Sequence, residues 1–192
     1  MSETSVNPQD IVTGVKNRIR VYPDFPKKGI LFYDIFPLFQ TPSLLNDVVR
    51  LFVQRLQPSD TSNEQQAIDV VVGLDSRGFL FGPSLANHLD ASFVPIRKKG
   101  KLPGEKYSVS YSLEYGVDAL EIQADSIKSG QRVVIVDDLM ATGGTMSAAC
   151  KLVQQLGGII KECQCVIELT GLKGVEKLPD GVPSYSIVQY EF

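Results

Sequence analysis

Residues 132–146 constrain the fold of this chain more than any other segment does. Val133 to Val136 is an unbroken run of β-branched residues, which is typical of a strand buried on both faces of a parallel sheet. Asp137 and Asp138 follow where that strand is expected to end, and the small-residue loop Ala141 to Thr145 comes next. A helical pattern of apolar residues follows the loop. This order predicts an anion site, because the N-terminus of a helix presents N–H groups and the positive end of its dipole.

The two acids indicate that the ligand of this site is more than a phosphate. Carboxylates repel phosphate, but they accept hydrogen bonds from ribose hydroxyls and they bind Mg²⁺. The segment therefore predicts a site for a sugar phosphate with a metal ion. The alternative is that Asp and Gly simply end a strand, since turns favour both residues; the ordered succession of strand, acids, loop and helix argues against it. The loop is neither a Walker loop nor a dinucleotide fingerprint, because it lacks Gly-Lys-Ser/Thr and G-x-G-x-x-G.

Size and charge exclude several other classes of protein. A chain of 192 residues is expected to fold as one domain, or as one domain with a small appendage. A net charge of −3 and a pI near 5.2 argue against a general nucleic-acid binder. Apolar runs fall far short of the ~20 residues that a membrane span needs, and the N-terminal residues are polar, so we expect a cytoplasmic protein with neither a membrane nor a nucleic-acid partner. Cys150, Cys163 and Cys165 are expected to be reduced packing residues.

Strand and helix patterns alternate along the chain, and this alternation predicts an α/β fold. We expect a mainly parallel, twisted sheet flanked by helices. The expected strands are 30–35, 68–73, 92–96, 119–123, 133–136, 159–169 and 185–190, and the expected helices are 8–19, 42–56, 79–89 and 146–156. Residues 21–29 are expected to form an ordered loop, because they contain two prolines and a glycine, and residues 170–181 a further loop.

Two further strand ends carry residues that suit an anion. Asp75, Ser76 and Arg77 follow the expected strand 68–73, and a guanidinium fork matches the geometry of phosphate oxygens. Residues 97–101 hold four cations in five positions, which on an acidic protein indicates a polyanionic ligand, although any single lysine there is also explained as a solvated side chain. Ligands of open α/β sheets bind at the carboxyl ends of the strands. The chain therefore offers a second anion site at such a strand end.

Two segments are candidates for covering the site. Residues 102–116 are polar and tyrosine-rich, and part of this long segment alternates like an antiparallel ribbon. Such an excursion from the edge of a sheet often closes over a site and excludes water. Residues 22–39 are dense in aromatic side chains, which form either a packed cap or a stacking surface for a planar ligand. The pattern by itself favours the packed cap.

These features together resemble the type I phosphoribosyltransferase family. Residues 133–145 are similar to the family's motif for phosphoribosyl pyrophosphate (PRPP), and the likeness extends over residues 19–190. Other segments resemble the members of the family that act on adenine, namely 22–26 with 29–35, 73–83, 97–104 with 111–116, and 168–169 with 172–174. The resemblance implies a single domain over residues 1–192, with an N-terminal helix and base-binding cap in residues 1–40 and a flexible hood in residues 98–117.

The resemblance also implies a reaction and its binding residues. The reaction is Mg²⁺-dependent transfer of ribose 5-phosphate from PRPP to N9 of adenine, which gives AMP and pyrophosphate and salvages the purine. Asp137 and Asp138 would bind the ribose and, through water, the metal. The 5′-phosphate would be held by Ala141, Thr142, Gly143, Gly144 and Thr145, and the adenine by Leu31, Phe32, Tyr33 and Leu169. The pyrophosphate would be held by Asp75, Ser76, Arg77, Arg97, Lys98 and Lys101, in a region where relatives often carry a cis peptide.

Catalysis would rest on the hood and on the pyrophosphate loop. Glu114 matches the residue assigned as general acid and base toward the purine nitrogens, and Tyr115 and Arg77 complete the catalytic set. Tyr33 departs from the family pattern, since many relatives have arginine there. Reading of the adenine edge by main-chain groups would tolerate that change. Relatives are homodimers, so a homodimer is expected here by analogy.

Two alternatives stay open. A regulator on the same fold would bind PRPP without catalysis, but it would not need Glu114, Arg77 and Arg97, all of which are present. A transferase for another base, such as xanthine, hypoxanthine-guanine or orotate, would keep the same PRPP loop. Turnover of each base in the presence of PRPP and Mg²⁺ distinguishes these possibilities.

Overall fold

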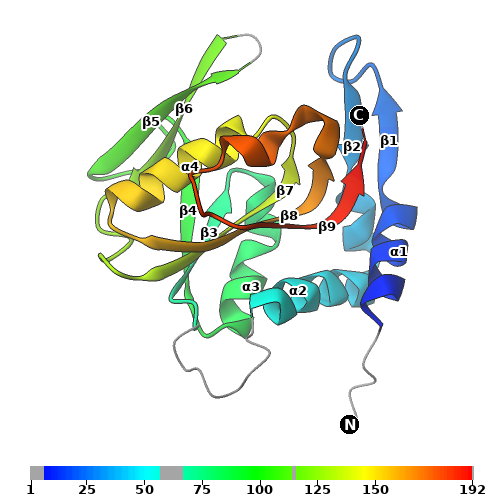
Figure 1. The fold of residues 1–192 in the computed structure, drawn as a ribbon, viewed down its shortest axis with the longest axis horizontal. Helices are drawn as coiled ribbons and strands as arrows, with labels where there is room; N and C mark the ends of the chain where they lie inside the picture. The colour runs from blue at the N-terminus through cyan, green and yellow to red at the C-terminus, as the bar shows by residue number, and fades with distance from the viewer. Residues whose placement is uncertain (1–6, 57–66, 114–115, 192) are drawn as a thin grey trace. The chain divides into compact units, whose positions relative to one another are not determined.

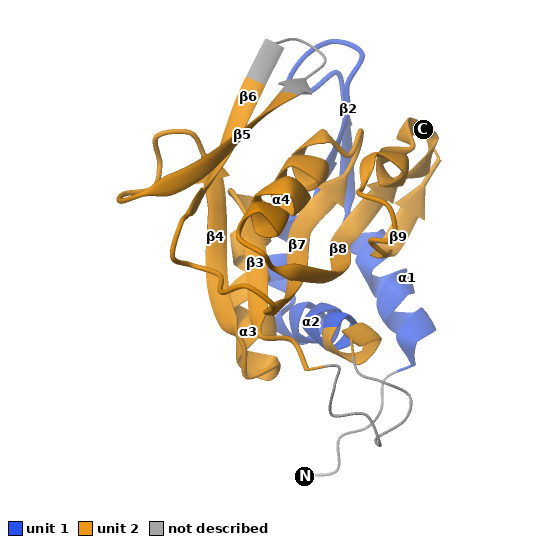
Figure 2. Cartoon of the chain, turned by 60° about the vertical axis from the view of Figure 1, so that its left-hand side comes forward, with its two compact units in different colours: residues 1–52 blue, residues 53–192 orange. Residues whose placement is uncertain are grey.

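The computed structural model describes residues 7–56, 67–113 and 116–191. The chain, drawn in Figure 1, divides into two compact units, residues 1–52 and residues 53–192 (Figure 2). The first unit contains a helix, a two-stranded sheet and most of a second helix, and the second unit contains the large sheet. Among the described residues, no helix combines the length and the apolar character that crossing a membrane requires.

Helix α1 (Pro8–Arg18) opens the first unit, and its start is encoded locally. The side chain of Asn7 accepts a hydrogen bond from the Gln9 N–H at 3.0 Å, which satisfies one of the unpaired donors of the first turn. Ile11 and Val15 are buried one turn apart, as an amphipathic helix requires.

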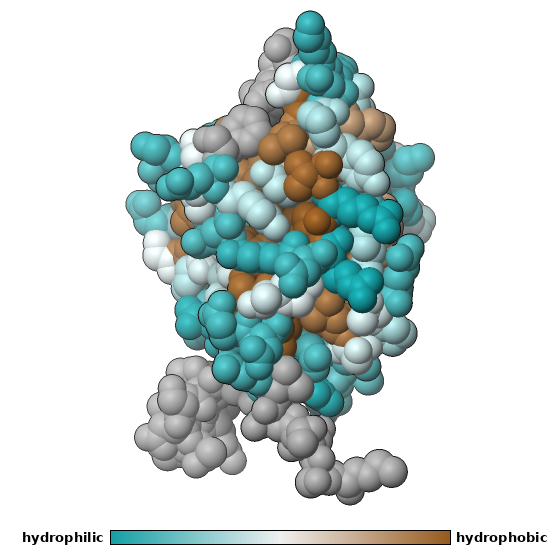
Figure 3. Space-filling view, turned by 90° about the vertical axis from the view of Figure 1, so that its right-hand side faces the viewer, coloured by the Kyte–Doolittle hydropathy of each residue, from teal (hydrophilic) through white to brown (hydrophobic). Residues whose placement is uncertain are grey.

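The face of the molecule drawn in Figure 3 shows hydrophilic side chains around smaller apolar patches.

A β-hairpin follows where the sequence predicted a loop. Strand β1 (Arg20–Pro23) pairs antiparallel with strand β2 (Leu31–Asp34), so the prediction of a loop over residues 21–29 is wrong for its first three residues. Valine and tyrosine at positions 21 and 22 favour a strand, and Pro23 is tolerated because it stands at the strand's end. The prolines therefore mark the turn of the hairpin rather than a loop throughout.

The turn of this hairpin and the segment after it are held by local contacts. The carboxylate of Asp24 accepts a hydrogen bond from the Gly29 N–H at 2.7 Å, and the peptide bond between Phe25 and Pro26 is cis. The 3₁₀ turn η1 (Phe36–Gln40) comes after β2. Helix α2 (Pro42–Leu56) then runs through the boundary between the two units.

Seven strands form the sheet of the second unit, as far as the described residues show. Their order is β5-β6-β4-β3-β7-β8-β9, and the five strands from β4 to β9 in this order are parallel, whereas β6 runs antiparallel to both of its neighbours. The predicted α/β fold with a mainly parallel sheet is therefore confirmed. The strands are β3 (Val70–Leu74), β4 (Ser92–Lys98), β5 (Lys106–Leu113), β6 (Gly116–Gln123), β7 (Arg132–Met140), β8 (Ile159–Leu169) and β9 (Ser184–Tyr190).

Two crossover connections leave the centre of this sheet in opposite directions. Helix α3 (Gly82–His88) connects β3 to β4, and helix α4 (Gly144–Gln155) connects β7 to β8. Because β3 and β7 are neighbours, the strand order reverses between them. Figure 2 shows α4 lying across one face of the sheet. Such a reversal is where open α/β sheets bind ligands, outside the carboxyl ends of the strands.

Among the element boundaries that differ from the sequence-based expectation, three bear on the loops at the strand ends. Strand β7 continues through the two acids to Met140, so Asp137 and Asp138 lie inside the strand rather than after it. The predicted helix 79–89 is divided into the 3₁₀ turn η3 (Arg77–Leu80) and α3, because Pro83 favours the first turn of a new helix. The predicted loop 170–181 contains two 3₁₀ turns, η4 (Thr170–Leu172) and η5 (Gly174–Lys177).

The core of the second unit explains the β-branched runs of the central strands. Val72 of β3 and Ile135 of β7 are fully buried, and α4 covers the sheet with Leu152 and Val153. Burying each such side chain contributes about 1.5–3 kcal/mol, before the entropy cost of ordering it. The sequence pattern of these strands is continuous rather than alternating because both faces are covered.

The three cysteines are free and buried, as the sequence predicted. The Sγ atoms of Cys150 in α4 and Cys163 in β8 lie 3.5 Å apart. Their hydrogen bond and their burial raise the pKa of the Cys163 thiol far above its ordinary value, and burial raises the pKa of Cys165 as well. These side chains therefore behave as small apolar residues of the core.

One ion pair holds β3 beside β7 at the N-terminal ends of both strands. The Asp69 carboxylate accepts hydrogen bonds from the main-chain N–H, the Nε and the Nη2 of Arg132 at 2.7–2.8 Å. The main-chain N–H of Asp69 donates to the Arg132 carbonyl at 2.9 Å. The side-chain hydrogen bonds from Arg132 lower the pKa of Asp69 to about 2. A bidentate guanidinium–carboxylate pair has a defined geometry, so this contact sets the register of the two strands.

Replacing Asp69 with Asn is expected to lower the free energy of unfolding by about 1–2 kcal/mol at neutral pH, since the hydrogen bonds are charge-assisted but the side chain is partly exposed. The folded-state pKa lies below the ordinary value of 3.8, so the stabilisation is complete above about pH 4 and is lost as the pH falls toward 2. Urea unfolding between pH 7 and pH 3 measures both effects. The exposed Asp180→Asn variant is the control, and a difference between wild type and Asp69→Asn that did not shrink below about pH 4 would contradict the assignment.

Candidate active site

The carboxyl end of β7 carries the two acids singled out in the sequence. Asp138 is almost fully buried, and its N–H donates a hydrogen bond to the Asp137 carboxylate at 2.9 Å. Desolvation raises the pKa of Asp137 well above the ordinary value, and the neighbouring charge of Asp138 adds to that effect. Desolvation also raises the pKa of Asp138, although the Arg77 guanidinium opposes the shift. Two carboxylates this close to each other call for a cation or for hydroxyl donors on the ligand.

The loop after β7 delivers the chain to the N-terminus of α4. Gly143 is the N-cap of this helix with a φ of 76°, a left-handed conformation that suits glycine, and it has no side chain with which to cap the first turn. Its carbonyl accepts the Ser147 N–H at 2.9 Å, which starts the helical ladder. The first-turn N–H groups of a twelve-residue helix therefore point into the loop formed by Ala141 to Thr145. This geometry is that of a phosphate site.

A second loop, at the carboxyl end of β3, meets the end of β7. The peptide bond between Asp75 and Ser76 is cis, as is often found in the family that the sequence resembles. Nε of Arg77 forms an ion pair with Oδ2 of Asp138 at 2.9 Å. Gly78 lies so close to β7 that a Cβ atom there would be 2.5 Å from the Val136 carbonyl oxygen. The arginine loop and the two acids are therefore parts of one cluster.

Arg97, at the end of β4, is oriented by contacts on three sides. Its Nε donates to the Asp75 carboxylate at 3.0 Å, one of its terminal nitrogens donates to the Lys101 carbonyl at 3.2 Å, and its guanidinium carbon lies 5.9 Å from the centre of the Phe79 ring. Stacking on an aromatic face and hydrogen bonding to a carboxylate are both favourable for a guanidinium. These contacts place Arg97 beside the loop that carries Arg77, so the predicted second anion site is assembled from two neighbouring strands.

Phe79, whose ring lies against the Arg97 guanidinium, was not identified as a site residue from the sequence. Phe79 packs edge-on against Phe93 of β4, with ring centres 6.0 Å apart. Gly73 and Gly82 make room for the Phe93 ring, because a Cβ atom at either position would overlap it. The glycines that interrupt the strand and start the helix were the only sequence signal of this packing.

The two lysines predicted to bind pyrophosphate lie at the end of β4 and on the turn that follows it. Lys98 is largely exposed, and its Nζ lies 3.3 Å from the carboxylate of Asp118 on β6. Lys101 is exposed on the turn after β4. The N–H of Gly100 in this turn donates to the buried carboxylate of Glu121 at 2.9 Å, so β6 holds the basic turn in place. The sequence analysis did not identify Asp118 or Glu121, whose partners become apparent only when β4 and β6 are paired.

The residues predicted to bind a base lie in both units. Leu31, Phe32 and Tyr33 follow one another along β2 of the first unit, where the Phe32 ring packs edge-on against Phe25 with centres 5.0 Å apart. Tyr33 is buried, and burial raises its pKa. Leu169 is the last residue of β8 in the second unit and is also buried. The predicted catalytic residues Glu114 and Tyr115 lie outside the described residues.

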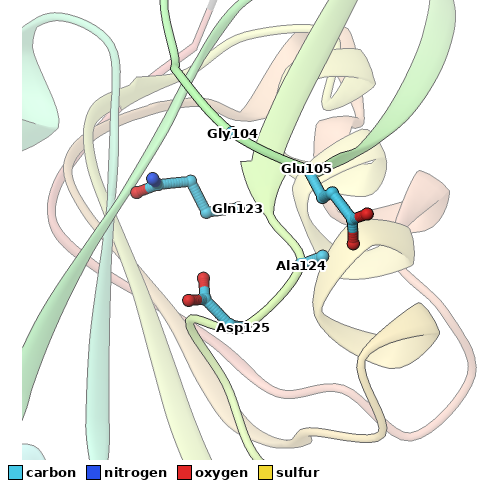
Figure 4. Close-up of a pocket in the computed structure, with 5 residues that line it drawn as sticks. All are labelled: Gly104, Glu105, Gln123, Ala124 and Asp125. Atoms are coloured by element: carbon cyan, nitrogen blue, oxygen red, sulfur yellow. The ribbon is translucent and has the colours of Figure 1, made fainter.

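A separate pocket lies beside the start of β5 and the end of β6. Its volume is about 370 Å³, and it is lined by Gly104, Glu105, Gln123, Ala124 and Asp125 (Figure 4). The carboxylates of Glu105 and Asp125 project in different directions. None of the residues predicted to bind substrate lines this pocket, so it is distinct from the cluster at the strand ends.

The donor set at the strand ends suits a metal that is held chiefly by its substrate. Within residues 7–56, 67–113 and 116–191, no group of three or more His, Cys, Asp or Glu side chains could hold a metal ion. Mg²⁺ is usually bound through one or two carboxylates, water and substrate phosphates rather than by an all-protein cage. Asp137 and Asp138 fit that requirement, since they provide two carboxylates beside a phosphate loop.

Comparison with known proteins agrees with this geometry. Residues 38–181 match the phosphoribosyl transferase domain family. Over 177 residues the chain is 55% identical to adenine phosphoribosyltransferase of the rat (Rattus norvegicus), and this alignment covers 92% of the chain and 96% of the rat protein.

Two solved structures are similar over most of their length. Adenine phosphoribosyltransferase from Saccharomyces cerevisiae, in complex with D-2,5-dideoxy-2,5-imino-altritol 1,6-bisphosphate and adenine, gives a TM-score of 0.87 at 43% identity, covering 94% of this chain and 99% of the yeast chain. Adenine phosphoribosyltransferase from Trypanosoma brucei, in complex with AMP, pyrophosphate and ribose-5-phosphate, gives a TM-score of 0.82 at 29% identity, covering 98% of this chain and 82% of the other.

The fold and the cluster of acids, arginines and phosphate loop define a phosphoribosyltransferase, and this chain belongs to the phosphoribosyltransferase family. Within that family, the relatives described above are all adenine phosphoribosyltransferases.

The Arg77–Asp138 pair is expected to couple the two loops energetically. Removing either partner by Arg77→Gln or Asp138→Asn should lower the free energy of unfolding by about 2–3 kcal/mol, because a buried charge or donor is left without its partner. A double-mutant cycle followed by urea unfolding should return a coupling energy of about 1–2 kcal/mol. The same cycle on the exposed Lys98–Asp118 pair is the control and should give less than about 0.5 kcal/mol. Equal coupling in the two cycles would show that Arg77 and Asp138 do not form a buried pair in solution.

Proposed function

We propose that this protein transfers ribose 5-phosphate from PRPP to N9 of adenine, with Mg²⁺, and releases AMP and pyrophosphate in purine salvage. The observation that carries the proposal is the meeting of β3 and β7, where two carboxylates, a helix N-terminus and the Arg77 guanidinium share one edge of the sheet. A ligand that suits all three groups has a phosphate, ribose hydroxyls and a further anionic group. The identity of 55% to the rat enzyme supports adenine as the base.

PRPP would bind with its two phosphate ends on opposite sides of the acids. The 5′-phosphate would take hydrogen bonds from the loop Ala141 to Thr145 and from the first turn of α4. The ribose hydroxyls would donate to Asp137 and Asp138. Arg77 and Arg97 would face the pyrophosphate, with Asp75 and Ser76 in the same loop and Lys98 and Lys101 adding positive charge.

The reaction exchanges one bond at C1′ for another. The bond from C1′ to the pyrophosphate oxygen breaks, and its electron pair leaves with the pyrophosphate, while N9 of adenine forms the new bond. Negative charge therefore grows on the leaving group, where the guanidinium groups of Arg77 and Arg97 stabilise it. Bound Mg²⁺ would supply further charge neutralisation on the pyrophosphate, and Asp137 and Asp138 would hold it through water.

Adenine would be recognised by main-chain groups of β2. In a two-stranded antiparallel ladder, every second residue points its N–H and C=O away from the partner strand. Leu31 and Tyr33 are two positions apart on β2, so their main-chain groups point to the same edge, and the proposal requires that this edge faces away from β1. Phe32 would supply apolar surface for a face of the base, and Leu169 is assigned to the base by the family resemblance. A tyrosine at position 33 is compatible with this mode, because its side chain is buried.

The proton on N9 must leave when the new bond forms, and we assign this task to Glu114. A carboxylate in the hood can accept that proton and return it in the reverse reaction. Tyr115 and Arg77 complete the proposed catalytic set. Residues 98–117 would act as the hood that excludes water from C1′, and residues 1–40 as the cap that carries the base site.

The proposal extends to a homodimer in the cytoplasm. Several large hydrophobic side chains of the first unit are exposed, as a contact surface for a second copy would require; they are Val21, Tyr22, Phe25, Ile30 and Phe36. The free thiols of Cys150 and Cys163, 3.5 Å apart, are in keeping with a reducing compartment.

A panel of bases tests the substrate assignment. With PRPP and Mg²⁺, adenine is expected to give AMP and pyrophosphate, whereas hypoxanthine, guanine, xanthine and orotate should react at less than about 1% of that rate, because the hydrogen-bonding edge of adenine differs from theirs. Chromatographic detection of each nucleotide provides the measurement, and excess EDTA should abolish turnover. Turnover of another base without AMP from adenine would overturn the assignment, and PRPP binding without turnover of any base would favour a regulator.

The role of Glu114 is tested by Glu114→Gln. Loss of the proton acceptor should lower kcat by about 100-fold or more while the dissociation constant of PRPP changes by less than about threefold. Glu191→Gln is the control, since it makes the same change at an exposed position outside the proposed hood. An equal loss of turnover and PRPP affinity in Glu114→Gln would argue for a role in binding instead.

A further inference from the structure

The phosphate loop after β7 lies against a glycine that neither the motif nor the proposed mechanism uses. A Cβ atom added to Gly174 would overlap the Ala141 carbonyl oxygen and would lie 2.9 Å from the Gly143 nitrogen. A Cβ atom added to Gly143 would in turn overlap the carbonyl group of Gly174. The two main chains therefore touch directly, with no room for a side chain on either one.

Gly174 is needed for space and not for an unusual backbone conformation. Its φ lies outside the left-handed range, whereas Gly143 has a φ of 76°. Any L-residue can therefore adopt the backbone of position 174, and only the contact with the phosphate loop excludes a side chain there. The atoms that a Cβ would meet include main-chain atoms, which cannot rotate away as the end of a flexible side chain can.

The segment that carries Gly174 is itself firmly held. The Glu176 N–H donates to the Lys173 carbonyl at 3.1 Å, and the Leu178 N–H donates to the Val175 carbonyl at 3.1 Å. Val175 and Leu178 pack against the core of the second unit. Turn η5 is thus a fixed surface, and the phosphate loop rests on it.

The geometry points to Gly174 as a positioning residue for the 5′-phosphate. Gly143 is the N-cap of α4, so its position sets the direction of the first N–H groups of that helix. A shift of the loop by a few tenths of an ångström would misalign those donors. This inference rests on the proposed function, in which the loop holds the 5′-phosphate of PRPP, and it adds a residue thirty-one positions after Gly143 to that site.

Gly174→Ala is expected to raise the KM and the dissociation constant of PRPP about tenfold or more, since small misplacements of positioning groups have large effects. The KM of adenine should change by less than about twofold, because the base is bound elsewhere. Steady-state kinetics and calorimetric titration of PRPP with Mg²⁺ give these values. If Gly174 mattered for stability alone, the variant would have a lower melting temperature, and the KM values of PRPP and adenine would change equally.

Gly158→Ala is the matched control. Gly158 also has an ordinary φ and is crowded, although its nearest neighbours are side-chain atoms, with a Cβ position 2.8 Å from Val153 and 3.1 Å from Val133, and it lies past the C-terminal end of α4. This variant should lose stability while the KM of PRPP stays within about twofold of wild type. Gly174→Ala with wild-type PRPP affinity, or the same rise in both variants, would overturn the inference.

Hydrogen exchange on the unaltered protein tests the same point if Gly174→Ala does not fold. PRPP with Mg²⁺ should slow exchange in residues 141–145 and also in residues 172–176, whereas adenine alone should slow neither. Protection of the loop without protection of residues 172–176 would contradict the inference. Failure of the proposed function looks different, because wild type itself would then neither bind PRPP nor form AMP.

Discussion

The parallel pairing of β3 with β7 is the contact on which the rest of the site depends. Val70 to Gly73 lie opposite Val133 to Val136 in unbroken register, and the strands leave toward different neighbours. This register brings Arg77 to Asp138 and Gly78 to the Val136 carbonyl. A slip by one residue would turn each side chain of one strand to the opposite face of the sheet and separate the two loops. The buried aliphatic side chains of β3 and β7 thus fix the positions of the charged groups at the ends of these strands.

The site keeps charges of both signs close together, with Asp138 buried and the two arginines partly exposed. Burial alone would favour the neutral forms of Asp137 and Asp138, and their pKa values are raised accordingly. The Arg77 guanidinium opposes that tendency at Asp138. Arg97 is in turn oriented by Asp75 and by the Phe79 ring. PRPP, the substrate proposed above, would offer its phosphates to the guanidinium groups and its hydroxyls to the carboxylates, which a simple anion could not do.

The sequence predicted the parts of the site that are local in the chain. The run Val133 to Val136, the acids, the small-residue loop and the helix follow one another, so their order alone indicates a strand end and an anion site. The contacts that hold the loops are not local. Asp118 and Glu121 meet the basic turn only because β6 pairs with β4, and Gly174 meets Gly143 only because η5 returns to the loop. The sequence did not predict strand β1, because prolines in the turn of a hairpin give the same pattern as prolines in a loop.

The burial of the cysteines has a consequence for how this protein responds to thiol-reactive compounds. Cys150 and Cys163 join α4 to β8 in the core, and Cys165 lies opposite Asp137 in the β7–β8 ladder. All three thiols are buried, and the raised pKa values of Cys163 and Cys165 keep those two in the unreactive protonated form, so a reagent can attack only after α4 separates from the sheet. The rate of alkylation therefore reports the opening of the element that carries the phosphate loop, and a ligand bound at that loop protects thiols that it does not touch.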